Sequence, residues 1–524
     1  MKGCFARALG GDMRLIAAKI VFVGALHVAG VALAASAGDR SDCEQGADME
    51  RRIAGCTRVI QDQSESAANR AVSYGNRAIA YKAKGELDRA IADHNEAIRL
   101  DPRNANSYTN RGIAYAAKGD MGRAIADYNE AIKIDPRYAN AFLSLGVAYA
   151  GLGQHDRAIA DYGQVIRLDP KHSGAYYNRA FAHDARGEID EAIADLNEAI
   201  RIDPKYAHAY GARGVAHNAK GESERAIADF NEAIKLDPKF SAAYNGRGTS
   251  FRAKGEFDRA IADYTEAIRL NPNFAIAYNG RGIAFTAKRD TDRAIADFND
   301  AIRLGPKDAT ARRNRGLAYA AKGDYDHAIG DYNEAIRLNP NLAAAYTNRG
   351  SAWAGKKDYD RAIADFAEVI RLDPKSAKGY NSRASMWGAK DDYDRALADY
   401  NEAIRLEPSS THYTQRCWGR VRAGRDLQQA LSDCDQALRL APDDASIIGT
   451  QAFVYLRLNR PDDAIASYDA ALKHNPKIAF WLYGRGLAKL RKGDATGGNA
   501  DLAAAEAIQS DLASVYAKYG LKTR

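Results

Sequence analysis

The chain has 524 residues, of which 46% are hydrophobic and 27% are charged, which is the composition of a folded protein rather than of a disordered one. Its net charge of +7 comes from 75 basic and 68 acidic residues that are interleaved along the sequence. Because no block of like charge forms, this pattern argues against nucleic acid as a partner.

The first 37 residues have the pattern of a signal peptide. A basic start is followed by an apolar run over residues 20–33, and Ala35-Ser36-Ala37 provides a small-residue cleavage site. A membrane span needs about 20 apolar residues, so this run favours a signal cut after Ala37 over an uncleaved anchor, which remains the alternative. We expect a periplasmic or secreted protein with no membrane span in the mature chain.

Cysteine usage agrees with export. Beyond the signal, four cysteines remain, namely Cys43, Cys56, Cys417 and Cys434. An even number in an exported chain indicates two disulfides, and sequence order pairs Cys43 with Cys56 and Cys417 with Cys434. Buried free thiols are the alternative. Residues 38–70 are expected to form an N-terminal cap, in which the chain folds back before an N-cap at Asp48 and the first bridge closes the cap.

Proline placement reveals a repeat. Twelve of the thirteen prolines follow one another at intervals of 34 residues: Pro102, Pro136, Pro170, Pro204, Pro238, Pro272, Pro306, Pro340, Pro374, Pro408, Pro442 and Pro476. A constant period of 34 is typical of stacked two-helix repeats.

Residues 105–138 illustrate one repeat. Apolar residues at helical spacing predict a first helix over residues 105–118, which Gly119 ends. A second helix is predicted from about residue 122 to 134, where Asp135-Pro136 stops it. Two helices of this length joined by a short turn must pack antiparallel.

The residue series of each repeat resembles the tetratricopeptide repeat family. In residues 241–274 the series reads Tyr244, Gly248, Phe251, Ala260, Tyr264, Ala267 and Pro272. The resemblance implies an all-α, right-handed superhelical solenoid of antiparallel helix pairs. It covers twelve repeats over residues 71–478, and residues 479–524 are expected to hold a degenerate thirteenth repeat and a C-terminal capping helix.

Two charged positions depart from the usual family pattern. An arginine stands in the first helix of ten repeats, and an aspartate stands in the second helix of nearly all of them. We expect these residues to pair within each repeat and to fix the register of neighbours, as in Arg111–Asp127, Arg247–Asp263 and Arg281–Asp297. A partner one helical turn away, such as Arg89 for Asp93, competes with this arrangement, and a charged ligand track is the functional alternative.

Motifs for catalysis are missing from the sequence. It contains no Gly-Lys-Ser or Gly-Lys-Thr phosphate loop, no His-Glu-x-x-His, no Cys-x-x-Cys and no Gly-x-Ser-x-Gly. Carboxylates recur at constant positions in the repeat, whereas an active site would appear once. The sequence therefore predicts a protein without enzymatic activity, catalytic residues, metal or cofactor.

In the tetratricopeptide family the first helices line a concave groove that commonly takes extended peptides or partner helices. Residues predicted to face this groove vary between repeats, and asparagine is frequent among them: Asn110, Tyr177, Asn178, Asn245, Asn279, Arg313, Asn314, Asn348 and Asn381. An asparagine row can hydrogen-bond peptide backbone, although these side chains could equally cap or pair within the stack.

The sequence thus supports an exported scaffold that binds proteins or peptides along its groove. The alternative is a carbohydrate- or envelope-polymer-binding protein without catalytic activity, which an aromatic row in the groove would favour. Self-association through the terminal repeats is a further expectation.

Overall fold

The computed structural model describes residues 37–45 and 48–522 and is all-helical over them, in agreement with the predicted fold class. The predicted signal peptide lies outside the described residues, except for Ala37. The chain divides into two compact halves between residues 289 and 290. No helix of the described residues is both long and apolar enough to cross a bilayer.

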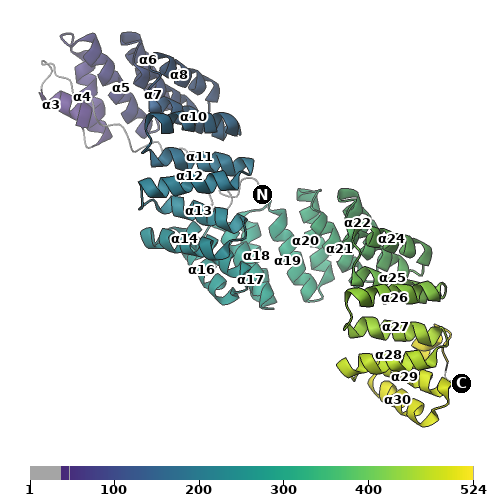
Figure 1. The fold of residues 1–524 in the computed structure, drawn as a ribbon. Coiled ribbons are helices and arrows are strands. Elements are labelled where there is room, and N and C mark those ends of the chain that lie inside the picture. Colours follow the sequence, from purple (N-terminus) through teal and green to yellow (C-terminus); the bar gives the residue numbers. More distant parts are fainter. Residues whose placement is uncertain (1–36, 46–47, 523–524) are drawn as a thin grey trace. The chain divides into compact units, whose positions relative to one another are not determined.

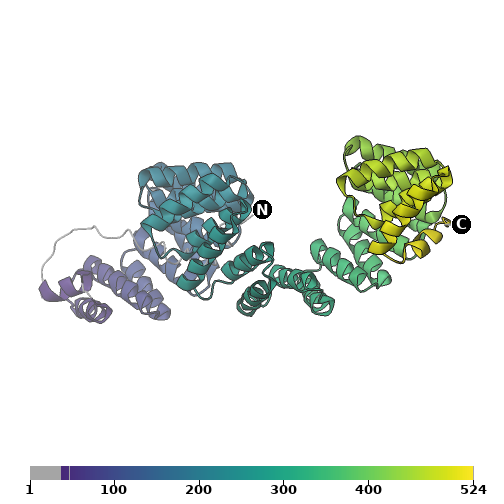
Figure 2. The same ribbon diagram turned by 90° about the horizontal axis from the view of Figure 1, so that it is seen from below.

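Successive helices of each half stack side by side in chain order, as Figure 1 shows and as the rotated view of Figure 2 repeats. The first half contains α3 (Ala37–Gln45), α4 (Met49–Gln61), α5 (Ala67–Ala83), α6 (Leu87–Leu100), α7 (Ala105–Ala117), α8 (Met121–Ile134), α9 (Ala139–Gly151), α10 (His155–Leu168), α11 (Ser173–Arg186), α12 (Ile189–Ile202), α13 (Ala207–Ala219), α14 (Ser223–Leu236), α15 (Ser241–Ala253), α16 (Phe257–Leu270) and α17 (Ala275–Ala287).

The second half contains α18 (Thr291–Leu304), α19 (Ala309–Ala321), α20 (Tyr325–Leu338), α21 (Ala343–Gly355), α22 (Tyr359–Leu372), α23 (Ala377–Ala389), α24 (Tyr393–Leu406), α25 (Ser410–Ala423), α26 (Leu427–Leu440), α27 (Ala445–Arg457), α28 (Pro461–His474), α29 (Ala479–Lys492), α30 (Ala495–Ile508) and α31 (Leu512–Ala517). Within each half, odd-numbered helices up to α30 are the first and even-numbered helices the second member of a pair, while α17 and α18 lie in different halves.

The pair α7 and α8 shows how the sequence sets these boundaries. Helix α7 ends before Gly119, whose φ of 85° lies in the left-handed region that glycine tolerates. The side chain of Asp120 then caps α8 by accepting a hydrogen bond from the backbone N–H of Arg123 at 3.1 Å. Gly112 lets the two helices approach closely, because a Cβ there would lie 2.6 Å from the ring of Tyr128.

Both ends of the array are capped. Helices α3 and α4 form a pair joined by the Cys43–Cys56 disulfide, and Asp48 caps α4 with a 2.9 Å hydrogen bond from the N–H of Arg51. At the other end, α29 and α30 form a complete thirteenth pair, although glycine-rich residues 495–499 weaken the helix propensity of α30. Helix α31 follows, and Leu512 and Tyr516 are fully buried in it.

Candidate binding surface on the first helices

Paired arginines and aspartates join the first and second helix of most repeats. In the repeat of α15 and α16, Nε and Nη2 of Arg247 each donate to a carboxylate oxygen of Asp263 at 2.8 Å, and this hydrogen bonding raises the pKa of Arg247. We call these pairs the arginine–aspartate ladder. Its members are Arg77–Asp93, Arg111–Asp127, Arg179–Asp195, Arg213–Asp229, Arg247–Asp263, Arg315–Asp331, Arg349–Asp365, Arg383–Asp399, Arg416–Asp433 and Arg485–Asp501.

The same guanidinium also reaches the preceding repeat. Nη1 of Arg247 donates to the side-chain oxygen of Asn231 in α14 at 2.7 Å, and Arg111 bonds Asn95 in the same way at 2.8 Å. One arginine therefore ties the two helices of its own repeat to the second helix of the repeat before. Arg281 and Asp297 lie in different halves; within the first half, Arg281 donates to Thr265 at 3.0 Å.

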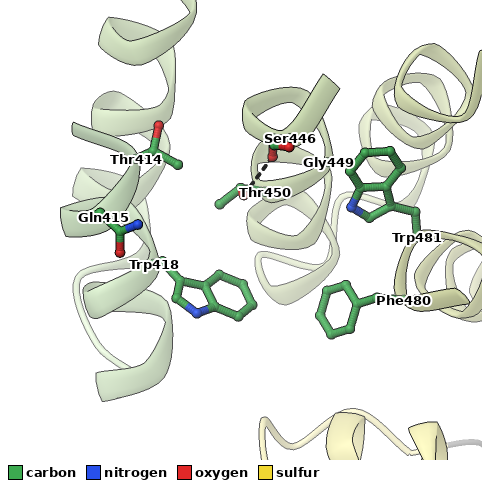
Figure 3. A pocket seen from close by; sticks show the side chains of 8 residues that line it. All are labelled: Thr414, Gln415, Trp418, Ser446, Gly449, Thr450, Phe480 and Trp481. Atoms are coloured by element: carbon green, nitrogen blue, oxygen red, sulfur yellow. Dashed lines mark hydrogen bonds between the residues drawn. The ribbon is translucent and has the colours of Figure 1, made fainter. Parts of the chain in front are cut away.

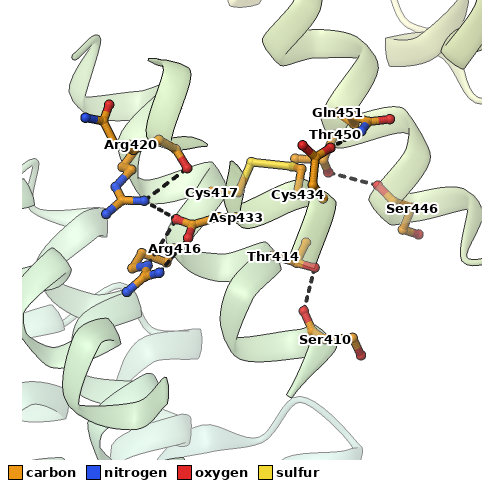
Figure 4. The surroundings of a disulfide bond; sticks show 12 residues. Ser410, Thr414, Arg416, Cys417, Arg420, Asp433, Cys434, Ser446, Thr450 and Gln451 are labelled. Carbon is orange, nitrogen blue, oxygen red and sulfur yellow. Dashed lines mark hydrogen bonds and ion pairs between the residues drawn. A yellow bond between two sulfur atoms is a disulfide. The ribbon is translucent and has the colours of Figure 1, made fainter. Parts of the chain in front are cut away.

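A shift of one residue in α25 changes which arginine joins the ladder. A constant 34-residue spacing places Cys417 at the ladder position, but Arg416 occupies it, with Arg420 as a second partner of Asp433. The shift moves Cys417 to the place of Gly112, opposite Cys434, which takes the place of Tyr128. A disulfide with the Cα atoms 5.9 Å apart therefore replaces the contact of glycine with tyrosine (Figure 4).

The ladder is interrupted in the repeat of α27 and α28, where Gln451 and Ser467 take the two positions, and in the repeat of α9 and α10. Leu145 stands where the arginine belongs, so Oδ2 of Asp161 is buried and has no hydrogen-bond partner among the described residues. Burial raises the pKa of Asp161 to about 7, although Arg157 one turn earlier partly opposes the shift. Gly163 also replaces the asparagine that would accept from Arg179 of the next repeat, so both links of this repeat are weakened.

The predicted groove residues divide into accessible and buried ones. Asn110, Asn178, Asn279, Arg313, Asn348 and Asn381 are half-buried on the first helices. In contrast, Tyr177, Asn245 and Asn314 have exposed fractions of only 2%, 3% and 8%. These three side chains therefore offer little exposed surface to a ligand.

Packing of the aromatic residue at the end of each repeat explains this burial. The aromatic residue that ends a repeat covers the first helix of that same repeat: the ring of Tyr206 lies 5.0 Å from that of Tyr177, and Phe240 lies over Gly211. The repeat position that Tyr177 and Asn245 share is thus partly a packing surface. Asn110 already has a local partner, because its amide donates to Asn106 at 2.7 Å.

An aromatic pocket of about 350 Å³ opens on the first helices of the last three repeats. Helices α25, α27 and α29 line it with Thr414, Gln415, Trp418, Ser446, Gly449, Thr450, Phe480 and Trp481, as Figure 3 shows. Trp481 lies directly on α27, since a Cβ on Gly449 would come within 2.4 Å of its indole. The volume of the pocket is at the lower end of the range for ligand pockets. We refer to this site as the aromatic pocket.

The C-terminal tail packs beside this pocket on the same helices. Tyr516 donates to the backbone oxygen of Phe480 at 2.6 Å, and its ring lies 4.7 Å from the Phe480 ring. The Tyr519 ring lies 6.0 Å from that of Trp418 and 5.3 Å from that of Phe453. Two rings of the pocket, Trp418 and Phe480, are therefore held by the tail.

Sequence reasoning missed both the aromatic pocket and the docked tail. The pocket residues occur in the last repeats only, so a comparison of repeats for recurring features passes over them. The available signal was that Phe480 and Trp481 stand where most other repeats carry small or polar residues. No group of three or more metal-ligating side chains that could hold an ion occurs within residues 37–45 and 48–522.

Helix pairs of constant length, stacked at a constant period and linked by recurring side-chain pairs, define a helical-repeat solenoid. Models described as tetratricopeptide repeat match residues 143–207, 182–241, 245–309, 287–343, 313–377 and 422–486, and a model described as TPR repeat matches residues 79–119 and 114–153. These matches cover most of the array, and the chain belongs to the tetratricopeptide repeat family.

Several solved structures are similar to this chain. The Cut9–Hcn1 hetero-tetramer of APC/C has 15% identity and a TM-score of 0.44, with 86% of this chain and 96% of that one covered. Yeast Tom70 has 19% identity and a TM-score of 0.38, with 81% and 96% covered. The protein MamA has 30% identity over 33% of this chain and 93% of its own, with a TM-score of 0.30. No curated protein matches the sequence.

Proposed function

We propose that this chain is an exported scaffold that binds partner proteins or peptides on the face lined by its first helices. The observation that supports the proposal most directly is the contrast between the two kinds of surface. Ladder residues recur with their partners bonded, whereas the first helices present residues that differ from repeat to repeat and include an open aromatic pocket. Variable residues on a rigid, repeated support suit binding, and we assign no reaction to them.

Export is part of this proposal, and it rests on residues 1–37 and on the cysteines. The two disulfides require an oxidising compartment, because cytosolic thiols are kept reduced. We expect the chain purified from the exported fraction of a bacterial host to have the intact mass of residues 38–524 minus four hydrogen atoms. A full-length mass, or four thiols that react with an alkylating reagent under denaturing conditions, would contradict this expectation.

The binding surface can be tested by affinity capture. The exported chain is incubated with an envelope extract, beside a variant in which Asn110, Asn178, Asn348 and Asn381 are changed to alanine. Because these side chains are half-buried on the first helices, we expect the variant to retain a defined partner protein at least tenfold less well, with its helicity and melting unchanged.

A matched control carries four partly exposed glutamates of the second helices, Glu130, Glu198, Glu232 and Glu334, changed to alanine. It should retain the partner as the natural chain does. If both variants lose the partner equally, binding does not depend on the first helices. If the retained material is glycan alone, the chain is a polymer-binding protein and the scaffold proposal is wrong.

A further inference from the structure

The lining of the aromatic pocket carries no charged side chain. Among its eight residues are three aromatic rings, from Trp418, Phe480 and Trp481, and four polar but uncharged side chains. An anionic ligand group placed there would lose hydration and gain no ion pair. The pocket therefore selects against anionic ligands such as phosphate and carboxylate groups.

The ring positions favour a flat group. Trp418 and Phe480 come from different helices and stand 6.0 Å apart at an angle of 75°, an edge-to-face arrangement. Trp481 is held against the backbone of α27 at Gly449 on the opposite part of the lining. Aromatic rings attract a further ring by offset stacking or by edge-to-face contact, so a planar side chain gains more here than a branched aliphatic one.

Polar groups in the lining complement a peptide backbone. The hydroxyl of Thr450 donates to the backbone oxygen of Ser446 at 2.8 Å, and that of Thr414 donates to Ser410 at 2.7 Å. Since each hydroxyl hydrogen is used within its own helix, the oxygen lone pairs remain to accept N–H groups from a ligand. Gln415 adds an amide that can both donate and accept.

The docked tail shows what kind of chain this surface holds. Residues 516–521 present Tyr516 and Tyr519 to Phe480, Phe453 and Trp418, and Leu521 is 3% exposed. An aromatic-bearing segment of this protein thus already covers part of the same ring cluster, and the pocket is the part that it leaves open.

We propose that the aromatic pocket binds an extended, non-acidic segment of a partner protein through one aromatic side chain, seated beside the chain's own C-terminal tail. This inference rests on the proposed function and adds the chemistry of the ligand. The partner side chain contacts Trp481 and Phe480, while Thr414 and Thr450 accept hydrogen bonds from its backbone.

The test uses fluorescein-labelled, capped decapeptides of serine, glycine and threonine that differ at one central residue. The full chain is titrated into each peptide, and the fluorescence polarisation of the peptide is measured. We expect the probes with central tyrosine or phenylalanine to bind at least tenfold more tightly than those with alanine, aspartate or lysine. Trp481→Ala should weaken the tyrosine probe at least fivefold. Trp353→Ala is the matched control, because Trp353 stacks under Arg361 outside the pocket and should leave binding unchanged.

A second variant keeps the test independent of any packing defect caused by loss of the indole. Thr450→Val preserves the shape of the side chain and removes its acceptor, and we expect it to weaken the tyrosine probe at least twofold with unchanged melting. Equal binding of all probes, or an unaltered preference in both pocket variants, would overturn the proposal. So would binding of a neutral tetrasaccharide of N-acetylglucosamine in place of the peptides. Retention of a partner in the capture experiment would still support the scaffold itself.

Discussion

Replacement of Asp263 by alanine is expected to lower the free energy of unfolding of its repeat by about 2 to 3 kcal/mol. Asp263 is 7% exposed and accepts two hydrogen bonds from Arg247, so its removal leaves a half-buried guanidinium with only the neutral oxygen of Asn231. Repeat arrays open locally, so hydrogen exchange of the amides in α15 and α16 is the suitable measurement.

The matched control for this prediction lies one turn further along α16. Glu266 forms an exposed pair with Arg269, and Glu266→Ala should change stability by less than about 0.5 kcal/mol. Equal effects of the two substitutions would mean that the ladder contributes no more than a surface pair. If Arg247→Leu left stability unchanged and abolished partner capture, the ladder would be a ligand track instead of a structural element.

Stability is expected to depend on pH through Asp161. Below pH 4 the carboxyl group is protonated in both the folded and the unfolded chain. Between pH 4 and its folded pKa of about 7, only the folded chain keeps the proton, so the contribution of this group to stability falls as the pH rises and levels off above pH 7. Asp161→Asn removes the ionisation, and we expect it to stabilise the repeat by about 1 to 2 kcal/mol at pH 8, allowing for partial exposure.

Leu145→Arg tests the same site by supplying the arginine that Asp161 lacks. The new guanidinium would take the ladder position opposite Asp161, lower the pKa of that carboxyl and make stability in α9 and α10 independent of pH between 5 and 8. The measurement is chemical denaturation or hydrogen exchange at both pH values. A natural chain whose α9 and α10 are equally stable at pH 5 and pH 8 would show that Asp161 is hydrated enough to ionise normally.

The sequence was sufficient for the parts of the structure that repeat. A 34-residue period, the glycine and proline positions and the complementary arginine and aspartate columns all follow from local helix geometry, and the helices begin and end within a few residues of the predicted bounds. Pairing of Cys417 with Cys434 also followed from sequence order, because both lie in one helix pair.

Features that depend on contacts between residues distant in the sequence were harder to predict. Burial of Tyr177 follows from the ring of Tyr206, which lies 29 residues further along the chain, and no periodicity within one helix reports it. The partner of Asp433 was missed because a one-residue shift in α25 breaks the constant spacing. The aromatic pocket combines residues from three helices and a tail, and only the three-dimensional arrangement brings them together.

The ladder arginines bond both their own repeat and the repeat before, and this affects how such a chain can change in evolution. Most ladder arginines bond one aspartate of their own repeat and one amide of the repeat before, and a typical repeat supplies both. Duplication or loss of a whole 34-residue segment by unequal recombination would therefore supply each guanidinium of a typical repeat with both partners, whereas other changes of length need a local adjustment such as the one-residue shift in α25. The bonding pattern thus favours growth or shortening of the array by whole repeats.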